Sequence, residues 1–280
     1  MRWRLSLKPG SPEKTLELNQ RDNQPDENPP AGLAAALLGA VQFLLVSPAF
    51  IRRAFTPQEM GAAVGFYPVA GLILGLILAG VRFLFALVIP PLLSAALILA
   101  LWVALTGALH LDGFLDSCDG LLGGFTPEQR LEIMRDERVG AYALAGGSLL
   151  LLTKFSALVS IPWIIPALVS AALLSRWGVA MVLVAFPYAR SEGLGRAVKN
   201  HAGWRQALLA SIITLAVLAL LAFWAPPVPV ILSVVAAGLV SILFARFTLA
   251  RLPGLTGDIY GAVNELVEVA VLIVWCFSWK

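Results

Sequence analysis

The chain has 280 residues, of which 59% are hydrophobic and 13% are charged, and its formal net charge is +3. Soluble domains carry about 25% charged residues, so this composition excludes a soluble globular protein. Several apolar runs reach or approach the roughly 20 residues that a membrane-spanning helix needs. We therefore expect an all-α protein, a polytopic integral membrane helical bundle with about seven membrane segments (six to eight).

The chain begins with a polar stretch over residues 1–30 that contains five basic and five acidic residues. It lacks the early apolar run of a signal peptide, and we interpret it as a flexible tail. Residues 31–280 are expected to form a single membrane-embedded catalytic domain. The first apolar segment is Ala31 to Phe50. A full crossing by this segment would place the tail outside the cell, which the basic residues of the tail disfavour.

The remaining apolar segments form hairpins that turn at Pro-containing sites. Gly61 to Ile89 is interrupted by Pro68, and its Gly71 and Gly75 form a GxxxG pair that allows close helix approach. The later segments are Leu92–Leu109, Ala141–Ser160, Trp163–Phe186, Ala207–Trp224, Val228–Phe247 and Ile259–Trp279. The turns near residues 90, 162 and 226 carry no charge, whereas the opposite loops carry most of the arginines. The positive-inside rule therefore places those loops in the cytoplasm.

Three polar loops lie on this predicted cytoplasmic side, at Asp112–Gly140, Tyr188–Arg205 and Arg251–Asp258. In the first loop, Thr126-Pro127 predicts a helix start that carries LEIMRDERVG to its end. Most arginines lie in short loops and the chain has no basic helix, so nucleic acid is not an expected partner.

The first loop opens with an acidic cluster in the sequence HLDGFLDSCDGLLGG. Asp112, Asp116 and Asp119 are spaced i, i+4 and i+7, which on a helix places the three side chains on one face. Acids also favour helix starts, which is the purely structural explanation. Three carboxylates on one stripe repel each other unless a cation neutralises them. Their oxygen ligands favour Mg²⁺, Mn²⁺ or Ca²⁺.

Arginines in two of the loops provide candidate phosphate contacts. Arg135 and Arg138 flank a fourth carboxylate, Asp136, and the loop after Pro187 combines Arg190 and Arg196 with glycines. Planar guanidinium groups suit bidentate binding of phosphate. Charges that only satisfy the positive-inside rule are the alternative explanation.

A second set of ionisable residues lies within or beside the apolar segments. Asp258, Glu265 and Glu268 stand at the entrance of the last segment, and the two glutamates share a helix face. Buried carboxylates need a cation or hydrogen-bond donors. Lys154 and Arg176 lie near the middle of their segments and are candidate partners for these acids or phosphate ligands. His110 is either a ligand or a hydrogen-bonded neighbour.

Carboxylates, arginines and glycine-rich loops at a membrane surface together indicate transfer of a phosphate-linked group. The sequence has no P-loop, no Ser/His/Asp arrangement and no HExxH motif. These absences argue against a nucleotide-driven pump, a serine hydrolase and a zinc protease.

Four stretches resemble the cobalamin synthase family, the adenosylcobinamide-GDP ribazoletransferases. They are HLDGFLDSCDGLLGG (110–124), LEIMRDERVGAYA (131–143), PYARSEGLG (187–195) and GLTGDIYGAVNELVE (254–268). Their order and spacing fit the family over about residues 33–275, with a departure at FLLVSPAF (43–50). The resemblance implies a bacterial inner-membrane enzyme in which a ribose hydroxyl of α-ribazole, or of its 5′-phosphate, attacks adenosylcobinamide-GDP and releases GMP. Mg²⁺ is the implied cofactor, and the lipid bilayer surrounds the protein.

The resemblance also implies roles for the residues singled out above. The expected metal ligands, one of which would act as the base, are Asp112, Asp116, Asp119 and Asp136. The expected substrate-binding residues are His110, Arg135, Arg138, Lys154, Arg176, Arg190, Arg196, Asp258, Glu265 and Glu268. The sequence leaves open whether the protein forms a homo-oligomer.

Two other functions share some of these features. A CDP-alcohol phosphotransferase also cuts a pyrophosphate with aspartates on membrane helices, but its motif needs Ala-Arg where this chain has Asp116-Ser117. An ion-coupled transporter would explain Glu265 and Glu268 but not the glycine-rich aspartate cluster.

Overall fold

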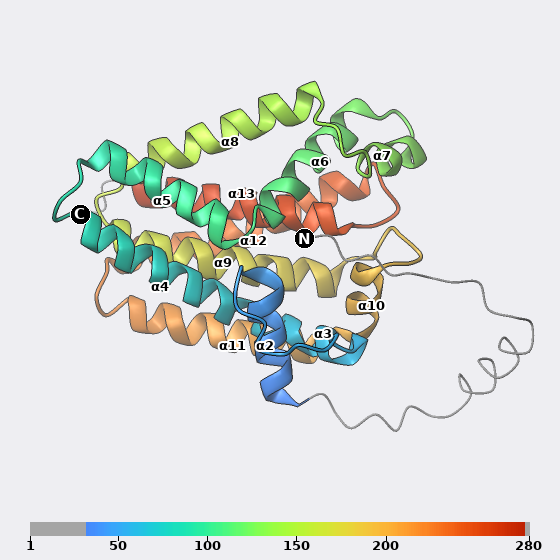
Figure 1. Cartoon of the computed structure of the whole chain (residues 1–280), viewed down its shortest axis with the longest axis horizontal. Coiled ribbons are helices and arrows are strands. Elements are labelled where there is room, and N and C mark those ends of the chain that lie inside the picture. Colours follow the sequence, from blue (N-terminus) through green and yellow to red (C-terminus); the bar gives the residue numbers. More distant parts are fainter. Residues whose placement is uncertain (1–31, 278–280) are drawn as a thin grey trace, which may run out of the picture. The chain divides into compact units, whose positions relative to one another are not determined.

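The computed structural model describes residues 32–277, and this part of the chain is built from helices (Figure 1). The elements are α2 (Leu33–Leu44), α3 (Pro57–Ala63), the 3₁₀ helix η1 (Val64–Phe66), α4 (Tyr67–Phe85), α5 (Pro91–Leu105), α6 (Leu109–Gly123), α7 (Pro127–Ile133), α8 (Ala141–Ser160), α9 (Ile164–Ala185), α10 (Leu194–His201), α11 (Trp204–Leu221), α12 (Pro227–Leu249) and α13 (Gly257–Cys276). The predicted all-α class is confirmed. The predicted tail, residues 1–30, lies outside the described residues.

Six stretches are long and apolar enough to cross a membrane: α3 to α4 taken together, α8, α9, α11, α12 and α13. The helices α5 and α6 make a seventh if this bent pair counts as one span. The prediction of about seven segments is therefore confirmed. Helix α2 has only 12 residues. At about 1.5 Å per residue it is shorter than the roughly 30 Å hydrocarbon core, so it does not cross as a straight helix.

A sharp bend between α5 and α6 turns the helix that carries the aspartate cluster away from the axis of α5. The two helices meet at 89°, and the bend contains two consecutive residues with positive φ, Gly107 (59°) and Ala108 (57°). A residue with a Cβ seldom adopts this conformation, so the turn at Ala108 is locally strained. The polar stretch from Asp112 onward therefore begins on a helix, because α6 continues to Gly123, and the helix predicted for the aspartate cluster is confirmed.

Two boundaries differ from prediction. Helix α7 begins at Pro127 with Thr126 as its cap, as predicted, but it ends at Ile133. The reason is local, because the Asp136 carboxylate accepts hydrogen bonds from the backbone N–H and guanidinium of Arg138, and such bonds compete with the helix. In the second polar loop, the structure adds helix α10.

Helix α9 is the centre of the bundle and packs against α4, α11, α12 and α13. The predicted close approach at Gly71 and Gly75 is confirmed, since both glycines face the α9 backbone. A Cβ added to Gly71 would lie 2.2 Å from the carbonyl oxygen of Ala172. One added to Gly75 would lie 2.8 Å from the Cα of Val169.

We expect Gly71→Ala to destabilise the bundle, because the clash is with backbone that cannot rotate away. Overpacking of this kind costs about 1–3 kcal/mol. The measurement is thermal unfolding of the purified protein in detergent. Gly80→Ala on the same helix is the matched control, because a Cβ there meets nothing within 4 Å. Equal unfolding temperatures for the two variants would contradict the packing argument.

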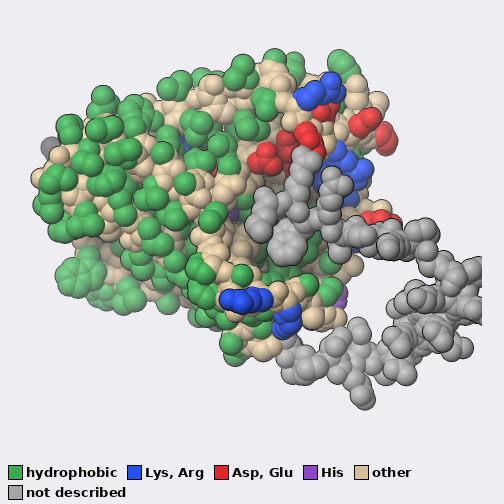
Figure 2. All heavy atoms as spheres, viewed as in Figure 1, with side chains coloured by type: hydrophobic (Ala, Val, Ile, Leu, Met, Phe, Trp, Pro, Cys, Tyr) green, Lys and Arg blue, Asp and Glu red, His purple; other side chains and the backbone are tan. Residues whose placement is uncertain are grey.

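The charged residues gather at one end of the bundle. The Pro-containing turns α4–α5, α8–α9 and α11–α12 lie at one end, and the polar loops lie at the other (Figure 1). On the face shown in Figure 2, acidic and basic side chains concentrate at the polar end, and hydrophobic side chains cover the rest. This separation is the one expected of helices that cross a bilayer.

Candidate functional site

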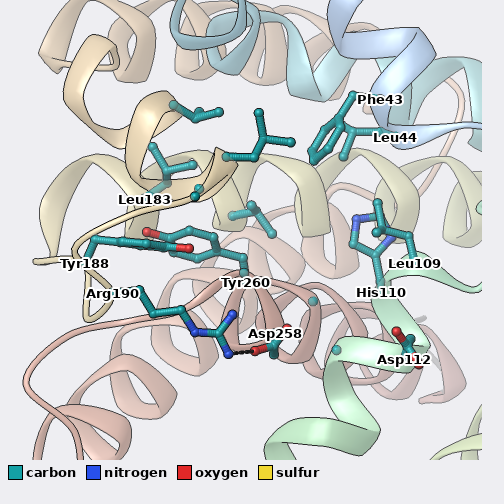
Figure 3. Close-up of a pocket in the computed structure, with 18 of the residues that line it drawn as sticks. Phe43, Leu44, Leu109, His110, Asp112, Leu183, Tyr188, Arg190, Asp258 and Tyr260 are labelled. Atoms are coloured by element: carbon teal, nitrogen blue, oxygen red, sulfur yellow. Dashed lines mark hydrogen bonds and ion pairs between the residues drawn. The ribbon is translucent and has the colours of Figure 1, made fainter. Parts of the chain in front are cut away.

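A pocket of about 380 Å³ lies at the polar end, between α2, α4, α6, α9, α10 and α13 (Figure 3). Four residues predicted from the sequence line it: His110, Asp112, Arg190 and Asp258. Glu192 is a further charged residue in its wall. The structure thus brings together side chains from the first, second and third polar loops.

Backbone hydrogen bonds join the second and third polar loops beside the pocket. The N–H of Ala189 donates to the carbonyl of Leu255 (2.8 Å), and the N–H of Leu255 donates to that of Pro187 (2.8 Å). Gly254 permits this contact, since a Cβ there would lie 2.6 Å from the Ala189 nitrogen. The two loops are therefore held in one register.

This register places Arg190 next to Asp258. The Arg190 Nη2 donates to the Asp258 Oδ2 at 2.9 Å, and the Thr256 hydroxyl donates to the same oxygen at 3.2 Å. Both charged side chains are about 20% exposed. The guanidinium is thus oriented at the pocket wall while it remains accessible to an anionic ligand.

Close packing of α6 against α13 brings the aspartate cluster to Asp258. A Cβ on Gly113 would lie 2.9 Å from the Asp258 carbonyl oxygen, and one on Gly261 would lie 2.9 Å from that of His110. Asp116 is near enough to Asp112 and Asp258 for their charges to repel. Within residues 32–277, the carboxylates of Asp112 and Asp116 have no hydrogen-bond partner, so both are free to bind a ligand.

Asp119, the third member of the cluster, is engaged by backbone. Its Oδ2 accepts from the N–H of Gly140 (2.7 Å), and its Oδ1 accepts from the N–H of Ala143 (2.9 Å). Gly140 is the cap residue of α8. Asp119 therefore satisfies N–H groups at the start of α8, which is a favourable place for an anion.

Asp136 lies on the surface outside the pocket lining. The hydrogen bonds from the Arg138 guanidinium lower the pKa of the Asp136 carboxyl to about 2. Arg135 is exposed in the same segment. Arg196 lies on α10 and is half-buried, but the α10 residues that line the pocket are Leu194, Gly195 and Val198.

The remaining predicted residues form a buried ionic network. Lys154 Nζ donates to Glu265 Oε2 and to Glu268 Oε2, each at 2.5 Å. The guanidinium of Arg176 donates to Glu268 Oε1 and lies 3.5 Å from His110 Nδ1. Of the two alternatives for Lys154 and Arg176, the structure shows them as partners of the acids. His110 joins this network to the pocket wall.

The carboxylate oxygens of this site fit a metal ion that is also held by the phosphates of a bound substrate. Nowhere in the described segment do three His, Cys, Asp or Glu side chains converge closely enough to hold an ion by themselves. Mg²⁺ is usually bound by one or two carboxylates together with water and substrate phosphates. Asp112 and Asp116 offer such a pair. Of the four predicted aspartates, Asp136 is paired with Arg138 on the surface. Asp119 lies near Asp116, but its carboxylate oxygens accept hydrogen bonds from the start of α8.

Sequence reasoning did not identify the aromatic and apolar residues of the pocket. Tyr188 and Tyr260 lie 6.2 Å apart between ring centroids, and each is next to or near a charged site residue in the sequence, which was an available signal. Burial raises the pKa of Tyr188, so this tyrosine remains a neutral hydrogen-bond donor. Phe43 and Leu183 carried no local signal.

Comparison with known proteins identifies close similarity over most of the chain. A family model described as cobalamin-5-phosphate synthase matches residues 36–276. A protein of Stutzerimonas stutzeri (strain A1501) named adenosylcobinamide-GDP ribazoletransferase is 43% identical over 246 residues, which cover 85% of this chain and 96% of that protein. A protein of the same name from Desulfitobacterium hafniense (strain Y51) is 39% identical over 239 residues, or 84% of this chain and 93% of that protein. No solved structure matches the chain.

Proposed function

The chain belongs to the cobalamin-5-phosphate synthase family, and we propose that it is an adenosylcobinamide-GDP ribazoletransferase that joins adenosylcobinamide-GDP to α-ribazole, or to its 5′-phosphate, and releases GMP. The observation that carries this proposal is a pocket lined by the unengaged carboxylate of Asp112 and the guanidinium of Arg190. The unengaged carboxylate of Asp116 is close enough to both of these groups for their charges to interact. Such a site can bind a pyrophosphate and accept a proton from an attacking hydroxyl.

The reaction is a displacement at phosphorus. A ribose hydroxyl oxygen of the acceptor forms a bond to the cobinamide-side phosphorus, and the bond from this phosphorus to the bridging oxygen breaks. GMP leaves with the bridging oxygen, and the hydroxyl proton passes to a carboxylate, for which Asp112 at the pocket wall is our candidate. Arg190 would hold non-bridging oxygens, at the cost of part of its contact with Asp258.

Mg²⁺ is the proposed cofactor, and Asp112 and Asp116 would hold it together with substrate phosphates. The ion would neutralise pyrophosphate charge as the leaving group departs. We propose that the phosphate on the GMP side of the pyrophosphate is contacted by Arg135, Arg138 and Arg196. In this proposal Lys154, Arg176, Glu265 and Glu268 support the site through His110 and α13.

The chain is a multi-pass membrane protein, and the relatives described above come from bacteria. We propose that it lies in the bacterial inner membrane with the polar end in the cytoplasm. The separation of charged loops from uncharged turns supports this orientation.

Product analysis tests the proposed function directly. Purified protein with Mg²⁺, adenosylcobinamide-GDP and α-ribazole should release GMP and the joined cobalamin in equal amounts. A chelator should stop the release, and added Mg²⁺ should restore it, because phosphate charge would otherwise remain unneutralised. Omission of α-ribazole is the control. Release of CMP from a CDP-alcohol, with no GMP from adenosylcobinamide-GDP, would reject the proposal.

A further inference from the structure

The pocket has two chemically different sides (Figure 3). Asp112, Arg190 and Asp258 lie on one side. The other side is apolar and is formed by α2, α9 and α10, with Phe43, Leu44, Val179, Leu183, Leu194 and Val198. This arrangement fits a ligand with an apolar ring at one end and polar groups at the other.

The size of the pocket selects between the two proposed substrates. Its volume of about 380 Å³ is near the lower limit of small-molecule sites, which run from about 300 to 1,000 Å³. One nucleoside can be enclosed in such a space. A corrin macrocycle that also carries a nucleoside diphosphate is far larger, so only part of it could enter.

Tyr260 supplies an unused hydrogen-bonding group in the pocket wall. Tyr260 is 8% exposed, and its hydroxyl is buried without a hydrogen-bond partner among the described residues. Buried polar groups nearly always have a partner, so an unpaired hydroxyl at a pocket is a natural contact for a ligand. A sugar hydroxyl can both donate to it and accept from it.

The apolar side also distinguishes between an azole base and guanine. Guanine has amide donors and acceptors, and burying them without hydrogen bonds is costly. Phe43, Leu183 and Val198 offer no side-chain hydrogen bond, but they suit a largely apolar aromatic ring. Phe43 already stacks with Tyr67, at 6.5 Å between ring centroids.

We propose that this pocket binds the nucleoside acceptor, with the aromatic azole base against Phe43, Leu183 and Val198 and the ribose beside Tyr260. This inference rests on the proposed function. The ribose then lies next to the carboxylates, and the corrinoid pyrophosphate meets it at the polar side of the pocket. Phe43 and Tyr260 become specificity-determining residues for the acceptor.

Two variants test this assignment by steady-state kinetics with each substrate varied in turn. Tyr260→Phe removes one hydroxyl, and Phe43→Ala removes one aromatic face. Each should raise the KM for α-ribazole by about five- to tenfold and change the KM for adenosylcobinamide-GDP by less than about twofold. The matched controls are Tyr142→Phe and Phe223→Ala, since both side chains are exposed and lie outside the pocket lining. They should change neither constant.

A binding measurement separates this inference from the proposed function. Equilibrium dialysis of α-ribazole with the protein alone should show weaker binding to Tyr260→Phe than to wild type. Equal binding, or a rise in KM only for adenosylcobinamide-GDP, would overturn the acceptor assignment. Failure of the wild type to release GMP would instead reject the proposed function, and the dialysis result would still decide whether the pocket holds the nucleoside. Unchanged unfolding temperatures will show that the variants are folded.

Discussion

Replacement of Asp112 by Asn is expected to lower turnover by roughly three orders of magnitude while the protein remains folded in the membrane. Asp112 lines the pocket, and its carboxylate has no hydrogen-bond partner in the part of the chain that the structure describes. Asn has nearly the same shape, but it carries no charge for a metal ion and cannot take a proton from a hydroxyl. The measurement is GMP release by the purified variant.

The other aspartates provide the comparison for this result. Asp116→Asn should resemble Asp112→Asn, whereas Asp119→Asn should mainly lower the unfolding temperature, because Asp119 accepts hydrogen bonds at the start of α8. A set of four equivalent metal ligands would instead require Asp136→Asn to be equally damaging. Glu128→Gln, at an exposed position on α7, is the neutral control. Activity within a few-fold of wild type for Asp112→Asn would remove this residue from the proposed site.

Replacement of Glu268 by Gln is expected to cause the largest loss of stability. Glu268 is 0% exposed and accepts hydrogen bonds from four side chains. The donors are Lys154, Ser175, Arg176 and Asn264. Loss of its charge leaves two buried cations with one anion, Glu265. An uncompensated buried charge costs about 3–5 kcal/mol, which corresponds to a drop in Tm on the order of 10 °C.

A double-mutant cycle tests whether charge imbalance is the cause. In Arg176→Met/Glu268→Gln, Lys154 and Glu265 remain as a balanced pair. The double variant should therefore be more stable than Glu268→Gln alone. Arg82→Met serves as a control for loss of a charge in a membrane-spanning helix outside the network. The single variant Arg176→Met completes the cycle. If the double variant loses as much stability as Arg176→Met and Glu268→Gln lose together, the network does not act as a unit.

Some features of the candidate site could be predicted from neighbouring residues in the sequence, and others depend on contacts between residues far apart in the chain. The spacing of Asp112 and Asp116 predicted one helix face, and α6 confirms the helix. The role of Asp119 as a cap of α8 had no local signal, because its donors are 21 and 24 residues away. Phe43 lines the pocket, although nothing in the sequence around it indicated a site residue.

The sequence by itself determined the membrane class, the number of spans and the end of the bundle at which charges gather, because hydropathy and loop charge act locally along the chain. Only the tertiary structure decided which charges neutralise each other. Arg190 and Asp258 are 68 residues apart, and Lys154 and Glu268 are 114 apart. Such pairs depend on which helix faces meet, and that choice follows from the packing of the whole bundle around α9.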